Sequence, residues 1–189
     1  MVLSKGNKPF IDRIANRNFV LLRGIVFIAA YILMNTLFLD FFMSQSNGNM
    51  FVETNIFYAS TLADILQSYG EIGRECYIKL SFQYDFIFPL QYSLFFASCS
   101  ILILKKYVNI KWQKAFLLIG GVLCLSEWAE NILIIVAIVR FPNIGILAIA
   151  AQFMTLLKTA LTVFFLIAII IGIVVLSVNK IKKIIIMFG

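Results

Sequence analysis

The chain has 189 residues, of which 62% are hydrophobic and only 13% carry a charge. An average soluble domain is about 45–50% apolar and about 25% charged, so this composition excludes an ordinary soluble protein. The net charge of +7 does not indicate nucleic-acid binding, because most of the basic residues lie just outside four apolar segments. We therefore expect an all-α integral membrane protein, a four-helix bundle formed by a single domain over residues 1–189.

The four apolar segments are each at or beyond the roughly 20 residues that a membrane helix needs. We expect a short amphipathic helix in the first outer loop at about 60–69, and membrane helices at about 19–42, 71–104, 114–139 and 145–177. Lysine and arginine gather before the first segment, between the second and third, and after the fourth. This positive-inside pattern predicts a protein of the cell (inner or plasma) membrane with cytoplasmic N- and C-termini.

The cysteine and histidine content limits the chemistry. The chain has three cysteines, of which Cys76 is expected outside the membrane and Cys99 and Cys124 deep in helices, so they do not form a disulfide framework. It has no histidine, which excludes His-ligated haem and nucleophiles activated by histidine. The sequence also lacks nucleotide fingerprints and recognised metal-ligand spacings, so we predict neither a cofactor nor a metal.

A polar stripe enters the membrane on the second helix. Arg74, Asp85 and Tyr92 fall close to one line at 100° per residue, and Tyr77 lies beside them. Pro89 removes the backbone hydrogen bond to the carbonyl of Asp85. Freed backbone groups in a membrane need polar neighbours or water, so this position favours a small polar pocket. The alternative is a tolerated kink with an interfacial acid.

The third helix carries the strongest functional signal, the sequence SEWAEN at residues 126–131. Glu127, Glu130 and Asn131 point to one side of a helix. A charge at a helix centre costs roughly 2.5–3.5 kcal/mol, so two glutamates in one turn need partners, protonation or water. Lys158 of the fourth helix is expected at similar depth and is the obvious counter-ion. A purely structural ion pair between these helices is the alternative.

These residues predict a site in the outer half of the bundle. Carboxylates that face a lysine can bind a cation or protonated amine, relay protons, or act as general acid and base. The candidate catalytic residues are Glu127, Glu130 and Asp85, and the candidate ligand-binding residues are Arg74, Tyr77, Tyr92, Asn131 and Lys158.

Three motifs resemble a pattern of small bacterial four-helix membrane proteins of uncharacterised function. They are YGxxGRxxY from Tyr69, DxxFPxxY from Asp85 and ExxEN from Glu127, and they cover the second and third helices. The architecture, with an acid followed by a proline in the second helix, also resembles the sterol isomerase and sigma-2 receptor fold. That likeness implies intramembrane acids that bind cationic or carbocation-like ligands.

The leading hypothesis is a multi-pass membrane protein whose acid-rich pocket binds or processes a lipid-like or amphipathic small molecule. Whether a reaction is catalysed stays open. One alternative is a non-catalytic subunit or assembly factor, whose acids pair with a membrane protein partner. The other is a proton-coupled transporter that acts as a homo-oligomer. No nucleic-acid partner is expected.

Overall fold

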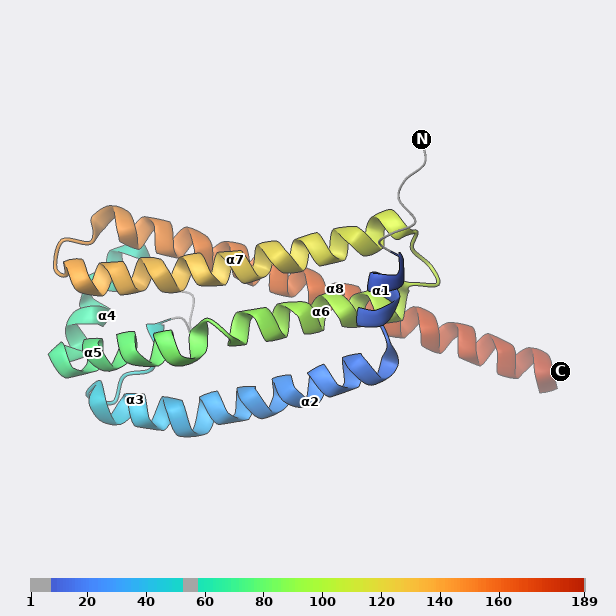
Figure 1. Cartoon of the computed structure of the whole chain (residues 1–189), viewed down its shortest axis with the longest axis horizontal. Helices are drawn as coiled ribbons and strands as arrows, with labels where there is room; N and C mark the ends of the chain where they lie inside the picture. The colour runs from blue at the N-terminus through green and yellow to red at the C-terminus, as the bar shows by residue number, and fades with distance from the viewer. Residues whose placement is uncertain (1–7, 53–57, 189) are drawn as a thin grey trace.

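The computed structural model describes residues 8–52 and 58–188, and this part of the chain is all-α. Three of its helices are long and apolar enough to cross a membrane, and a fourth span results if the bent pair α5 and α6 is one span. The elements are α1 (Lys8–Ile14), α2 (Arg17–Leu33), the π-helical η1 (Met34–Phe38), α3 (Leu39–Gln45), the 3-10 helix η3 (Ala59–Thr61), α4 (Leu62–Ser68), α5 (Gly70–Leu80), the π-helical η4 (Ser81–Asp85), α6 (Phe88–Leu104), α7 (Ile110–Arg140) and α8 (Gly145–Phe188). The long helices run side by side along the molecule (Figure 1).

The first span is a continuous helix from Arg17 to Gln45 that contains η1. The side chain of Asn16 caps its start by accepting a hydrogen bond from the backbone N–H of Asn18. Within η1, the amide of Asn35 donates to the carbonyl of Tyr31 at 2.8 Å. Single π-helical turns often lie at functional sites, and two residues of η1, Met34 and Asn35, line the cavity described below.

The second span breaks at residues 86 and 87, where α6 is bent by 41° from α5 and η4. Pro89 is the second residue of α6, a position where its missing N–H costs least. The bend falls directly after Asp85, as the position of the proline predicts. The π-helical turn Ser81–Asp85 lies at the same level and was not expected.

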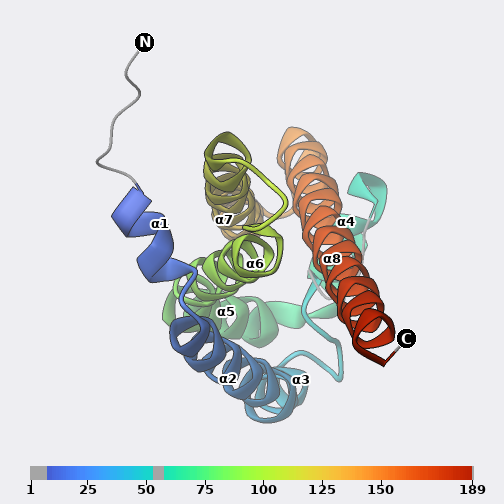
Figure 2. The same cartoon turned by 90° about the vertical axis from the view of Figure 1, so that its right-hand side faces the viewer.

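Helix α6 is the centre of the bundle. It packs against α2, α7 and α8, and α7 also packs along α8 (Figure 2). The approach of α6 to α7 is close because a glycine lies between them: a Cβ atom at Gly120 would lie 3.1 Å from the Cβ of Ala97. This contact fixes the two helices that carry Tyr92 and the glutamates.

The loop helix forms as an amphipathic element close to the predicted range. In α4, Leu62 and Leu66 are completely buried. The backbone N–H of Ala59 donates to the side chain of Gln152 at 3.0 Å, which ties the loop to α8. The loop therefore covers one end of the bundle.

Helix α8 runs past its predicted end near residue 177 and extends beyond the other helices (Figure 1). No glycine or proline occurs between 178 and 188, so no residue in this stretch stops the helix. The side chain of Asn179 donates to the hydroxyl of Tyr107 at 2.8 Å, which links this part of α8 to the loop after α6.

Candidate functional site

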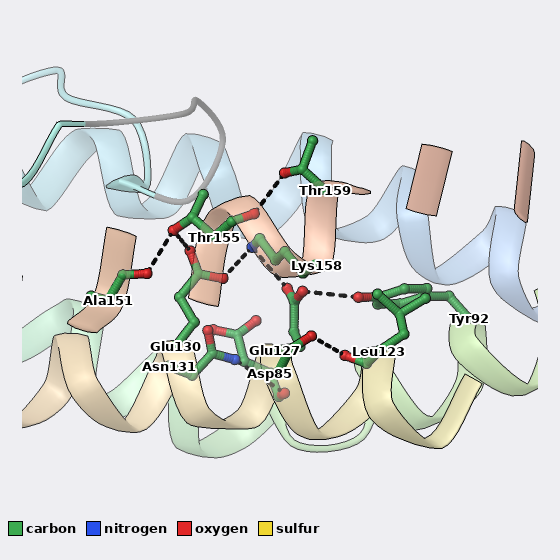
Figure 3. Close-up of polar contacts among 11 residues, drawn as sticks. Asp85, Tyr92, Leu123, Glu127, Glu130, Asn131, Ala151, Thr155, Lys158 and Thr159 are labelled. Atoms are coloured by element: carbon green, nitrogen blue, oxygen red, sulfur yellow. Dashed lines mark hydrogen bonds and ion pairs between the residues drawn. The ribbon is translucent and has the colours of Figure 1, made fainter. Parts of the chain in front are cut away.

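A cluster of ionisable side chains lies between α7 and α8. The ammonium of Lys158 is 3.2 Å from Oε1 of Glu127 and 2.5 Å from Oε2 of Glu130 (Figure 3). The two glutamates lie almost one turn apart on α7, so both reach the same partner. Glu130 is completely buried, whereas the side chains of Glu127 and Lys158 keep 15% and 12% of their surface exposed. Lys158, the predicted counter-ion, therefore forms ion pairs with both glutamates.

Each glutamate also accepts a hydrogen bond from a hydroxyl group. The hydroxyl of Tyr92 on α6 donates to Oε2 of Glu127 at 2.9 Å. The hydroxyl of Thr155, one turn before Lys158 on α8, donates to Oε1 of Glu130 at 2.6 Å (Figure 3). Burying a charge is costly unless it is paired and hydrogen-bonded, and Glu130 has both kinds of partner.

The break in the second span is held by side chains of α7. The indole N–H of Trp128 donates to the carbonyl of Phe86 at 2.9 Å. The amide of Asn131 donates to the backbone carbonyl of Asp85 at 3.4 Å. Asn131, a predicted ligand-binding residue, thus supports the backbone that presents Asp85. This amide gives the carbonyl of Asp85 a hydrogen-bond donor, as expected for a carbonyl that loses its helical partner at Pro89.

A cavity of about 300 Å³ opens beside the ion pair. It is lined by Tyr31, Met34, Asn35, Leu39, Phe51, Asp85, Phe88, Glu127 and Lys158. Two carboxylates and one ammonium therefore face the cavity, whereas the buried Glu130 does not line it. One wall of the cavity is formed by the first span, through η1 and the residues next to it.

The structure does not bring Arg74 and Tyr77 to this cavity. Nη1 of Arg74 donates to the carbonyl of Leu66 at 3.0 Å, and its guanidinium lies 4.7 Å from the centre of the Phe141 ring. Tyr77 is fully buried and packs against Phe42, with 6.0 Å between the ring centres. α5 extends away from the acids. Both residues therefore contact the elements at the end of the bundle and not the cavity.

Three residues of the site were not predicted: Asn35 and Phe51 line the cavity, and Thr155 donates a hydrogen bond to Glu130. Asn35 is a polar residue in the apolar segment of the first span, but nothing in the sequence connected it to the acids. Thr155 belongs to a polar stripe on α8, so its spacing from Lys158 was informative. Phe51 carried no signal, since its place depends on the folding of the outer loop.

Comparisons of the chain with models of protein families, with curated proteins and with solved structures gave no match. The motif resemblance therefore stays a prediction. Among residues 8–52 and 58–188, no three Cys, Asp or Glu side chains are grouped so as to hold a metal ion.

Proposed function

We propose that this membrane protein binds an amphipathic small molecule with a protonated amine in the cavity beside Lys158. The observation that carries the proposal is the excess of acid among the described residues: Glu127 and Glu130 both pair with Lys158, and Asp85 lines the same cavity as Glu127 and Lys158. Lys158 balances one carboxylate when all four groups are charged. Uncompensated charge at membrane depth is costly, so a cationic ligand is the partner that this charge distribution favours.

The acids have different roles in this proposal. Asp85 and Glu127 line the cavity and would contact the amine. Glu130 is inaccessible from the cavity and holds Lys158 in place. Tyr92 orients Glu127 through its hydrogen bond, so it acts as a positioning residue.

The apolar walls favour an amphipathic ligand over a simple cation. Met34, Leu39, Phe51 and Phe88 line the same cavity as the acids. Ligand pockets typically combine hydrophobic walls with a few polar groups and have volumes of about 300–1,000 Å³. A cavity of about 300 Å³ accommodates a head group with a short apolar portion.

The test is binding of dodecylamine to the purified protein in lipid nanodiscs, with dodecanol as the uncharged analogue of equal chain length. Asp85→Asn and Glu127→Gln should each weaken amine binding by about 10- to 150-fold, since a hydrogen bond to a charged group contributes about 1.5–3 kcal/mol. Glu75→Gln is the matched control, because Glu75 is exposed and pairs with Lys79 on the surface of α5.

Equal binding of dodecanol and dodecylamine, or equal loss in the Glu75→Gln control, would contradict the proposal. Loss of a co-purifying membrane protein in Glu127→Gln, with no amine binding by the native chain, would instead support the subunit hypothesis. A pH-dependent flux in proteoliposomes without amine binding would support the transporter hypothesis.

A further inference from the structure

A second hollow adjoins the acid-lined cavity. This apolar groove has a volume of about 280 Å³ and lies between the first span and the break in the second. It is lined by Val26, Ala30, Leu33, Met34, Phe38, Gln83, Tyr84, Ile87, Phe88 and Gln91. Met34 and Phe88 line both spaces, so the cavity and the groove meet at these two side chains.

Contacts between the first two spans bound the groove at both ends. At one end, the rings of Phe38 and Tyr84 are in contact, with 3.7 Å between their centres. At the other end, the amide of Gln91 donates to the carbonyl of Arg23 at 3.2 Å. The groove residues of the first span extend from Val26 to Phe38, which is roughly 18 Å at 1.5 Å per residue.

Between these ends the groove opens toward the surface of the bundle. Ile87, which lies in the helix break, is 71% exposed, and Leu33 of α2 is 42% exposed. Exposed apolar side chains on a membrane span face lipid. A molecule in the bilayer therefore reaches the groove from the side, without leaving the hydrocarbon.

We propose that this groove holds the single alkyl chain of the ligand, whose cationic head lies beside Asp85 and Glu127. The inference rests on the proposed function and adds the ligand class, a single-chain amine amphiphile that arrives laterally from the bilayer. The excess of carboxylates favours a cationic head group. Met34 and Phe88 line both the cavity and the groove, so a chain in the groove lies next to that head group.

The chain gains little from the hydrophobic effect here, because a lipid tail is as apolar as the groove. In water, burying one methylene improves affinity about fourfold. In a bilayer the dependence on chain length should be much shallower, and specificity should come from the head. Blocking the groove is therefore a sharper test than lengthening the chain.

The experiment uses dodecylamine with a photoreactive diazirine in its chain, bound to the full-length protein in nanodiscs. Mass spectrometry should place the label on groove residues of the first and second spans. Ala30→Trp fills the groove and should reduce this labelling at least tenfold, while binding of hexylamine at high concentration persists. Ile28→Trp is the control, because Ile28 lies on the same helix, is 57% exposed and does not line the groove.

Val26→Trp, which fills the far end of the groove, repeats the test independently of the stability of Ala30→Trp. Labelling spread equally over the exposed surfaces of α7 and α8 would show that ordinary lipid contact explains the signal and would overturn the inference. If both groove variants are labelled on the groove residues as strongly as the native chain, and Asp85→Asn still weakens dodecylamine binding, the groove is wrong and the proposed function stands. If Asp85→Asn weakens neither amine, the proposed function fails, and the groove inference with it.

Discussion

Lys158 is the residue on which the acid cluster depends, because it is shared by a buried and a partly exposed glutamate. Lys158→Met should lower the free energy of unfolding by about 3–5 kcal/mol, since it leaves Glu130 charged and unpaired in the interior. The double variant with Glu130→Gln removes that charge and should recover a large part of the loss. Denaturant titration in detergent measures both, and a single variant as stable as the native chain would contradict the arrangement.

Trp128, which lies within SEWAEN, has a structural role: it donates a hydrogen bond to the backbone at the helix break. Trp128→Phe removes the donor to the carbonyl of Phe86 and should cost about 0.5–1.5 kcal/mol, the net contribution of a typical hydrogen bond, because this one is only partly buried. Trp112→Phe is the matched control, because Trp112 is 61% exposed near the start of α7. Thermal unfolding of both variants checks this, and equal melting temperatures would show that the indole contributes nothing to the break.

The site residues divide by what determines their position. The pairing of Lys158 with Glu127 and Glu130 was predictable. Spacing within a helix determines the face on which a side chain lies, and depth in the membrane determines which side chains of two helices meet. Arg74 and Tyr77 were grouped with them by the helical periodicity of one straight helix. Periodicity does not give the distance along the axis or the bend, and α5 takes both residues to the end of the bundle.

At the level of elements, the contact between α6 and α7 depends on one of two adjacent glycines. Gly120→Ala places a Cβ 3.2 Å from the backbone oxygen of Ser93 and should destabilise by about 1–3 kcal/mol through overpacking. Gly121→Ala meets no atom within 4 Å and should cost nothing. Thermal unfolding of the pair checks this, and equal losses would contradict the close packing.

The membrane helices and the bend were predictable from composition, length and Pro89, which act locally. The π-helical turns in the first two spans were not, because an extra residue in a turn is stabilised by tertiary packing rather than by residue type. For the same reason the contribution of Asn35 to the cavity was not visible in the sequence. Hydropathy also placed the end of α8 too early, since helical structure continues beyond the apolar stretch.

At the scale of the whole molecule, the bent pair α5 and α6 should cross the membrane once. Glu71 and Lys106 then lie on opposite sides, with Lys106 in the cytoplasm as the basic clusters predict. Single cysteines at these positions, in a chain whose native cysteines are serine, can be labelled with an impermeant maleimide. Position 71 should react in intact cells and position 106 only after permeabilisation. Reaction of both from one side would indicate a re-entrant pair.

A cationic amphiphile bound in the acid-lined cavity should be directly visible. The most direct measurement is an experimental density map of the protein in nanodiscs with dodecylamine. We expect head-group density between Asp85 and Glu127, continued by chain density past Met34 and Phe88. A cavity filled by tightly packed side chains, or an amine bound elsewhere on the bundle, would contradict it.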